Sequence, residues 1–357
     1  MTYQSLWSPV KIGDLEVDNR VFMSPMTRNR GDRQGVPNEL NALYYGQRAG
    51  NGLIITEGTQ PSEVGQGYML TPGIYTPEQI TGWRAVTERV HAGGGHIFIQ
   101  LMHTGRVSHP DNTLNGTSRV APSAIAAPGE IITDGGPKSH PVPREMSVAE
   151  IEQTVQDYAD AAAAAIEAGA DGVEIHGGFG YLVHQFLAPN TNQRTDAYGG
   201  SVENRVRFAL EVADAIATRI GAARLGIRLS PGNPYNGVAE PEPRDTYAAL
   251  IRGLADIGVA YLHYVATENE ELVVEARDLW PHAFILNRPG ADLAARAQDV
   301  AEGLADAITV GALALANPDL VHRMQTAGHL NEPDASTFYG GDHVGYTTYP
   351  TLGGSGE

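Results

Sequence analysis

The segment Ser147–Gly178 reads SVAEIEQTVQDYADAAAAAIEAGADGVEIHGG and has the pattern of a helix followed by a short strand. Ser147 and Glu150 have the Ser-x-x-Glu spacing of a capping box, which predicts a helix over Val148–Ala168. The apolar run Gly172–His176 then predicts a buried strand with a polar end. A helix that leads directly into a buried strand is the repeating unit of a parallel sheet covered by helices.

The same alternation continues along the chain. Seven more apolar runs predict strands: Val21–Ser24, Gly52–Glu57, His96–Met102, Arg224–Leu229, Tyr261–Val265, Ala283–Leu286 and Ala307–Val310. Four more periodic segments predict helices: Pro77–His91, Val202–Ile220, Arg244–Ile257 and Ala291–Gly303. Eight strands alternating with helices predict the α/β class and a (β/α)8 TIM barrel, with residues 1–357 as one domain.

Three segments depart from the repeat. Within an N-terminal cap of residues 1–20, Lys11–Asn19 predicts a hairpin that turns at Gly13 and covers the bottom of the barrel. The stretch His103–Arg144 follows the third strand and has no clear periodicity, and an excursion of this length is usually functional. Residues 350–357 end in glycine and serine and predict a flexible tail.

The amino-acid composition excludes or disfavours several classes of function. The chain has 42 acidic and 24 basic residues, and a net charge of -18 disfavours a nucleic-acid partner. With no cysteine, it has no disulfide, no Cys-ligated metal and no thiol nucleophile. We see no signal peptide and no apolar run long enough to span a membrane, so we expect a cytoplasmic protein without a membrane partner.

Polar residues gather where the predicted strands end. They are Thr27, Glu57, Gly58, Gln100, His103, His176, Arg228, Asn287, Arg288 and Gly311. Barrel enzymes place their active sites at the C-terminal ends of the strands, so these positions predict one site. Other roles stay open, because Gln100 can be a core polar group and Glu174 can pair with His176 or Arg228. No metal-binding, P-loop or Rossmann motif is present, so we expect no metal.

Several blocks of sequence together resemble one family. They are Val21–Arg28 (VFMSPMTR), Gly52–Thr59 (GLIITEGT), Gln100–Arg106 (QLMHTGR), Gly172–Gly177 (GVEIHG), Asn192–Arg205, Ala316–Leu320 (ANPDL) and Thr337–Gly341 (TFYGG). In this order they resemble the old yellow enzyme family of FMN-dependent ene reductases, over Arg20 to Leu352.

The resemblance implies a role for each polar position. Non-covalent FMN would be bound by Pro25, Met26, Thr27, Gly58, Gln100, Arg228, Asn287, Arg288, Gly311, Ala312 and Phe338. The substrate would be bound by Tyr68, Met102, His176, Phe179 and Tyr339, although Tyr68 and Tyr339 can equally be packing aromatics. NADPH or NADH would supply hydride to the flavin. His176 would donate a hydrogen bond to the oxygen of an activated alkene, and Tyr181 would protonate the α carbon after hydride transfer to the β carbon. The enzyme would be a monomer or homodimer.

Three departures from the family pattern leave alternatives open. Phe179 stands where the family has a second donor, His or Asn, to the substrate oxygen, and Met102 replaces a tryptophan. Ala312 replaces an arginine that binds the FMN phosphate in the family. Arg288 could supply the missing positive charge, or it could be a solvent-exposed loop residue. These residues suggest a bulkier substrate, or a desaturase, nitroester or nitro reductase, or tailoring enzyme, and Ala312 also suggests a flavin-free binding scaffold.

Overall fold

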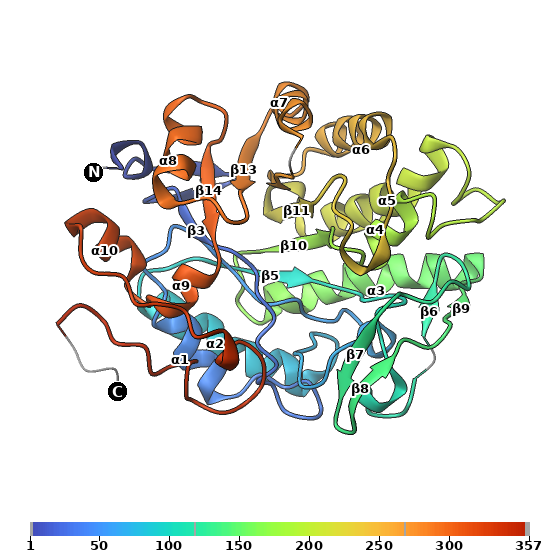
Figure 1. The fold of residues 1–357 in the computed structure, drawn as a ribbon, viewed down its shortest axis with the longest axis horizontal. Coiled ribbons are helices and arrows are strands. Elements are labelled where there is room, and N and C mark those ends of the chain that lie inside the picture. Colours follow the sequence, from blue (N-terminus) through green and yellow to red (C-terminus); the bar gives the residue numbers. More distant parts are fainter. Residues whose placement is uncertain (1–2, 118, 268, 354–357) are drawn as a thin grey trace.

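The computed structural model describes residues 3–117, 119–267 and 269–353. Eight parallel strands pair in one closed ring, with β14 returning to β3, and helices surround them (Figure 1). The strands are β3 (Val21–Met23), β4 (Ile54–Ile55), β5 (Ile97–Leu101), β10 (Gly172–Gly177), β11 (Leu225–Leu229), β12 (Tyr261–Val265), β13 (Ala283–Asn287) and β14 (Ala307–Val310). The predicted TIM barrel and its eight strand positions are confirmed, although β4 is much shorter than the predicted Gly52–Glu57.

All five predicted helices are present, within a few residues at each end. They are α2 (Pro77–Ala92), α3 (Val148–Glu167), α5 (Val202–Ile220), α6 (Pro243–Ile257) and α8 (Leu293–Ala301). The Ser147–Glu150 capping box forms as predicted, and it satisfies amide groups that the first turn of α3 leaves without partners. Sequence analysis missed five helices, which are α1 (Glu39–Gly46), α4 (Leu182–Leu187), α7 (Glu270–Leu279), α9 (Ala312–Ala316) and α10 (Leu320–Thr326). All five have ten residues or fewer, so each shows too few turns for a clear period.

The N-terminal hairpin covers the bottom of the barrel. Strands β1 (Val10–Ile12) and β2 (Leu15–Val17) pair antiparallel around Gly13. Ile12 and Val17 are buried in one apolar cluster with Phe22 and Phe98 of the barrel strands. Gly13 has a φ of +60°, and a Cβ atom there would lie 2.0 Å from the Ala223 carbonyl oxygen, so only glycine lets the hairpin dock this closely.

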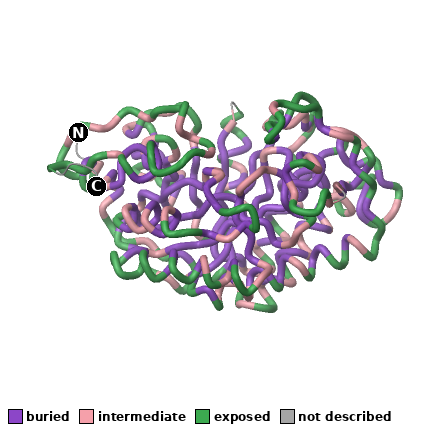
Figure 2. The backbone as a smooth tube through the Cα atoms, turned by 90° about the horizontal axis from the view of Figure 1, so that it is seen from below, coloured by how far each residue is buried: buried purple, intermediate pink, exposed green. Residues whose placement is uncertain are grey.

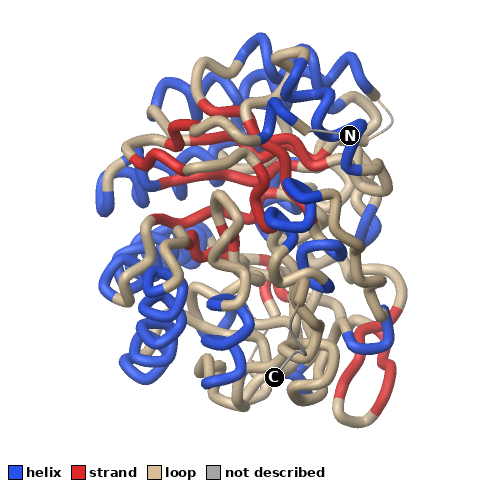
Figure 3. The backbone as a smooth tube through the Cα atoms, turned by 90° about the vertical axis from the view of Figure 1, so that its left-hand side faces the viewer, coloured by secondary structure: helices blue, strands red, loops and turns tan. Residues whose placement is uncertain are grey.

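The excursion after β5, whose sequence has no clear periodicity, is partly ordered as strands. It holds β6 (Val120–Ala121), β7 (Glu130–Thr133), β8 (Gly136–Ser139) and β9 (Arg144–Glu145), with β7 and β8 forming an antiparallel hairpin. Figure 3 shows this hairpin apart from the barrel strands. The turn sequence Asp134–Gly135 is a hairpin signal that sequence analysis overlooked.

The residues of the barrel wall and of the layer beneath its helices are buried, while those of the outer turns are exposed (Figure 2). The segment after α10 returns across the barrel opening, where the Arg28 side chain donates to the carbonyls of Phe338 and Gly345. Tyr346 stacks on Tyr44 of α1, with ring centroids 4.1 Å apart. These contacts hold Phe338 and Tyr339 near the C-terminal ends of the barrel strands.

The predicted flexible tail is only partly described, because residues 354–357 lie outside the described part of the chain. The preceding residues make specific contacts. The Pro350 carbonyl accepts from Asn331, and the Leu352 amide donates to Asp319 at 2.7 Å.

Candidate active site

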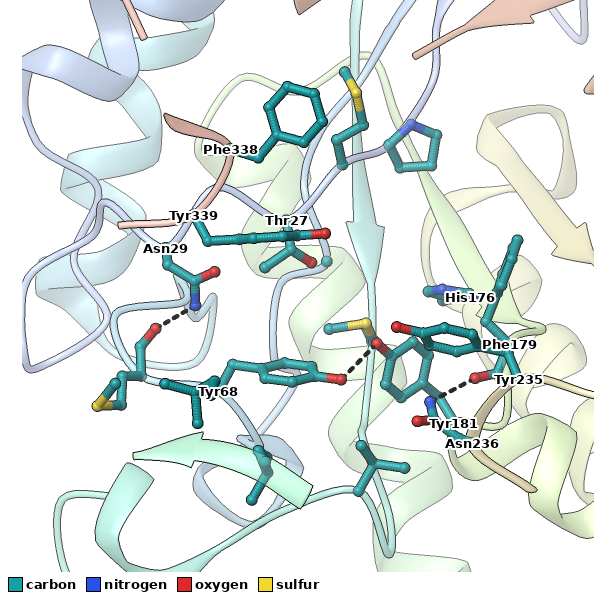
Figure 4. Close-up of a pocket in the computed structure, with 18 of the residues that line it drawn as sticks. Thr27, Asn29, Tyr68, His176, Phe179, Tyr181, Tyr235, Asn236, Phe338 and Tyr339 are labelled. Carbon is teal, nitrogen blue, oxygen red and sulfur yellow. Dashed lines mark hydrogen bonds between the residues drawn. The ribbon is translucent and has the colours of Figure 1, made fainter. Parts of the chain in front are cut away.

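A cavity of about 730 Å³ opens at the C-terminal ends of the barrel strands. Fourteen of the predicted site residues line it: Pro25, Met26, Thr27, Gly58, Tyr68, Gln100, Met102, His176, Phe179, Tyr181, Arg228, Ala312, Phe338 and Tyr339. Figure 4 shows His176, Phe179, Tyr181 and Tyr235 on one side of it and Thr27 and Tyr339 on the other. Residues far apart in sequence meet here because parallel strands all end at the same rim.

His176 is the last side chain of β10 before its two glycines, and it is a hydrogen-bond donor. Its Nδ1 accepts from the Gly178 amide at 3.3 Å, so the proton of the neutral ring sits on Nε2. Burial, and then the positive charge of Arg228, hold the pKa of His176 well below its usual 6.5. The ring is therefore neutral at physiological pH, with one N–H to offer a ligand.

Tyr181 lies five residues after His176, in the turn that leads into α4. The two ring centroids are 5.0 Å apart, and the Tyr181 hydroxyl lies 3.0 Å from that of Tyr68 (Figure 4). Burial raises the pKa of Tyr181 well above 10 and that of Tyr68 to about 12. Both phenols therefore stay protonated, which is what a proton donor in this cavity requires.

Arg228, on β11, is a buried cation whose charge is not paired with an acid among the described residues. No hydrogen bond or ion pair joins it to another described residue, and its Nε is buried without a partner. Burial lowers its pKa to about 10, so it remains charged. A buried charge left unpaired is costly, so this guanidinium fits an anionic or electron-rich ligand group.

Phe179 lies against that cation. The Arg228 guanidinium carbon is 4.9 Å from the centroid of the Phe179 ring, a distance at which cation–π attraction applies. Its backbone φ is +52°, which is unfavourable for a bulky residue. The Phe179 amide donates to Ser230 Oγ, and its carbonyl accepts from Asn236 Nδ2, both at 2.8 Å, so neighbours hold the strained turn.

Gln100 has both of the roles that sequence analysis left open. It lines the cavity, and its Nε2 donates to the buried Glu174 carboxylate at 2.7 Å. That carboxylate also accepts from Tyr261 and lies 2.9 Å from His263 Nδ1, so it pairs with neither His176 nor Arg228. The Gln100 amide oxygen remains available to a ligand.

Two other polar strand ends are structural. The Glu57 carboxylate accepts from the Arg28 and Asn29 amides, and His103 Nδ1 accepts from Gly105. Both side chains are buried and neither lines the cavity.

Three predicted cofactor residues are not brought to the cavity lining: Asn287, Arg288 and Gly311. Asn287 Nδ2 donates to Thr309 Oγ1, and Gly311 is the N-cap of α9. Arg288, which was predicted to help bind the FMN phosphate, pairs through Nε with Asp299 at 2.7 Å and through Nη1 with Glu270 at 2.6 Å. Two carboxylates already neutralise this arginine.

Some residues that line the cavity were not predicted from the sequence. They are Asn29, Met69, Leu70, Val107, Glu130, Ile131, Ile132, His140, Tyr235, Asn236, Leu315 and Gly340. Tyr235 and Asn236 carried a usable signal, because they follow the fifth barrel strand on the catalytic face. Glu130–Ile132 belong to the β7–β8 hairpin.

Among the described residues, no three His, Asp or Glu side chains gather in a way that could hold a metal ion. In the same part of the chain, no helix is long and apolar enough to cross a membrane.

The profile of the NADH:flavin oxidoreductase / NADH oxidase family matches residues 5–331. The chain belongs to this family. It is 40% identical to a probable flavin mononucleotide-dependent alkene reductase of Leishmania infantum, over 96% of both chains. Among solved structures, morphinone reductase in complex with tetrahydroNAD is 43% identical over 97% of both chains, with a TM-score of 0.93. The old yellow enzyme homologue of Zymomonas mobilis is 36% identical, covers 97% of this chain and 99% of its own, and has a TM-score of 0.94.

The resemblance to the old yellow enzymes is thus confirmed, and this flavin oxidoreductase is an FMN-dependent enzyme that uses a nicotinamide donor. The flavin-free scaffold suggested by Ala312 is set aside. The cavity fits FMN on its own chemistry, because Arg228 lacks a partner and Gln100 keeps a free amide oxygen. Gly58 leaves space for the Met102 side chain, which would lie 2.5 Å from a Cβ atom at position 58.

Proposed function

We propose that this enzyme reduces activated C=C bonds, in α,β-unsaturated carbonyl or nitro compounds, at the expense of NADH or NADPH. One observation carries the proposal: a neutral His176, a protonated Tyr181 and an unpartnered Arg228 line the same cavity. This set supplies a donor for the substrate oxygen, a proton for the carbon and positive charge for the flavin.

The flavin-holding side of the cavity would consist of Pro25, Met26, Thr27, Gly58, Gln100 and Arg228, with Ala312 and Phe338 at its edge. FMN held there would supply the hydride-transfer chemistry that links the nicotinamide donor to the alkene. Arg228 would face the electron-rich pyrimidine ring, where a guanidinium in a poorly solvated site attracts negative charge most strongly.

His176 and Tyr181 would act on the substrate. The Nε2–H of His176 donates to the carbonyl or nitro oxygen and draws electron density from the double bond. Tyr181 then gives its phenolic proton to the α carbon, and the hydroxyl of Tyr68, 3.0 Å away, stabilises the phenolate that remains. Because the pKa of Tyr181 is raised, the proton is held until a carbanion as basic as an enolate forms.

The rest of the substrate would contact an aromatic and apolar wall formed by Tyr68, Met102, Phe179 and Tyr339. Phe179 cannot donate a hydrogen bond, and Met102 adapts its shape to bulky groups. This wall favours a larger, more apolar alkene than a simple cyclic enone.

Phe179 also favours a second candidate function, in which the same flavin site acts as a nitro or nitroester reductase, a desaturase or a tailoring enzyme. Such reactions depend less on a strongly polarised carbonyl oxygen.

The test is a substrate panel with purified, FMN-loaded enzyme. Cyclohexenone, maleimide, a nitroalkene and a bulkier enone are offered under anaerobic conditions with NADH and with NADPH, and the products with a saturated C–C bond are quantified. We expect reduction, fastest for the bulkier enone, and loss of the saturated product in Tyr181→Phe. Enzyme that is reduced by the coenzyme but turns over no alkene in the panel would favour the second candidate.

A further inference from the structure

Two loops close the catalytic side of the cavity, and they pack as one unit. The turn 178–182 carries Phe179 and Tyr181, and the loop 230–242 carries Tyr235 and Asn236. Gly180 has a φ of +76°, and a Cβ atom there would lie 2.6 Å from the Tyr235 carbonyl oxygen and 2.7 Å from the Asn236 Cβ. The two loops are therefore in direct contact at Gly180.

His184, on α4, contacts both loops from behind. Its side chain is fully buried, and its Nδ1 accepts from the Gly180 amide at 2.9 Å. An accepting Nδ1 carries no proton, so the proton of the ring is on Nε2. That Nε2 lies 3.1 Å from Oε2 of Glu240, in a contact too bent for a good hydrogen bond but close enough for electrostatic attraction.

Glu240 closes the second loop. Its side chain is only 3% exposed, and its Oε2 accepts from the Gly232 amide at 2.9 Å, near the other end of the same loop. Tyr247 of α6 donates its hydroxyl to Oε1 at 3.0 Å. His184 Nε2, 3.1 Å from Oε2, adds a third and electrostatic contact to this buried carboxylate.

We infer that His184 is a positioning residue for the proposed reaction, acting on Tyr181 through Gly180 and on the Tyr235 loop through Glu240. The imidazole touches neither the cavity nor the reacting atoms, since His184 is absent from the lining. Each ring nitrogen contacts one loop, so a substitution can remove one contact and keep the other. This inference rests on the proposed role of Tyr181 as proton donor.

Substitutions that mimic one nitrogen each test it. The Asn amide oxygen sits where Nδ1 of histidine does, whereas the Gln amide nitrogen sits where Nε2 does. His184→Asn therefore keeps an acceptor for Gly180 and loses the Glu240 contact, while His184→Gln does the reverse. His184→Ala removes both contacts, Glu240→Gln removes the charge alone, and exposed His322 on α10 supplies a matched control, His322→Gln.

The readouts are the two half-reactions of FMN-loaded enzyme by stopped-flow absorbance, with flavin content and melting temperature measured in parallel. We expect reduction by the coenzyme to stay within about 2-fold in every variant. Reoxidation by cyclohexenone should fall about 10-fold in His184→Gln and His184→Ala, because Tyr181 is misplaced, and stay within about 2-fold in His184→Asn. His184→Asn and Glu240→Gln should instead raise the alkene concentration needed for half-maximal reoxidation.

Equal reoxidation rates in His184→Gln and His184→Asn would overturn the inference. If His184→Gln loses FMN or melts early, the reoxidation rates of His184→Asn and His184→Ala are compared instead. A faster rate in His184→Asn supports the inference, because asparagine restores only the Gly180 contact. Equal rates in these two variants refute it. Tyr181→Phe separates the two proposals. An unchanged reoxidation rate in Tyr181→Phe refutes the proposed function. A slowed rate in Tyr181→Phe, with unchanged rates in the His184 variants, refutes only the inference.

Discussion

Replacing Phe179 with asparagine should add a hydrogen-bond donor beside His176, on the side of the cavity where the substrate oxygen is proposed to bind. The Phe179 and His176 rings meet edge to face with centroids 5.9 Å apart, so an amide at position 179 lies within reach of the same oxygen. A hydrogen bond to a group that develops charge is worth about 1.5–3 kcal/mol. We therefore expect kcat/KM for cyclohexenone to rise about 10- to 100-fold, corresponding to roughly 1.4–2.7 kcal/mol.

The same substitution has two opposing effects on stability. The φ of +52° at position 179 costs phenylalanine about 1 kcal/mol or more, and asparagine tolerates this region better. Loss of the ring removes the contact 4.9 Å from Arg228, worth about 1–2 kcal/mol where water is largely excluded. These terms nearly cancel, so the melting temperature should change by about 5 °C or less, and a change in activity reports the donor.

Phe179→Leu is the matched control, because it loses the ring, keeps the strained backbone and adds no donor. Steady-state rates with cyclohexenone are compared for wild type, Phe179→Asn and Phe179→Leu at equal flavin content. Phenol titration of the oxidised enzyme gives a second readout through its long-wavelength charge-transfer band, and the asparagine variant should bind phenols more tightly.

If the asparagine and leucine variants have equal kcat/KM and equal phenol affinity, a missing donor does not limit this enzyme. Tyr235 is then the next candidate donor, since its ring packs edge to face on Phe179 with centroids 6.1 Å apart. Tyr235→Phe in the wild-type background would show it.

Three further predictions concern the flavin and the pH profile. Arg228→Met should lower FMN occupancy and slow flavin reduction by about 10-fold or more, because the cavity loses its buried cation, and unchanged FMN titrations and reduction rates would remove Arg228 from the flavin site. Arg288→Ala should leave FMN affinity within about 2-fold and lower the melting temperature by a few degrees, because Arg288 pairs with Glu270 and Asp299; weaker FMN binding would restore its phosphate role. Reoxidation by an alkene should be flat from about pH 6 to pH 9, because the depressed pKa of His176 keeps it neutral and the raised pKa of Tyr181 keeps it protonated. A titration near neutrality that disappears in a His176 variant would show that His176 ionises there.

Much of the site could be predicted from the sequence because its signals are local. A strand that ends in a polar residue points that residue at the rim of a parallel barrel, and this placed Thr27, Gln100, His176 and Arg228 correctly around one opening. The capping box of α3 was equally local, since it involves residues three apart. A position at the end of a strand did not tell whether a side chain lines the cavity or supports the loops around it. It therefore placed Glu57 and His103 in the site, although both have structural roles.

Only the tertiary structure decided which of these side chains have partners. The Tyr68–Tyr181 hydrogen bond joins residues 113 positions apart, and the carboxylates that neutralise Arg288 come from α7 and α8. Arg288 and Arg228 both follow or end barrel strands, yet Arg288 pairs with two acids, whereas Arg228 pairs with none in the described part of the chain. Sequence alone therefore determined the barrel and the face that carries the chemistry, because helix and strand periodicity are properties of neighbouring residues. The state of each charge depends on distant segments that meet only when the ring of strands closes.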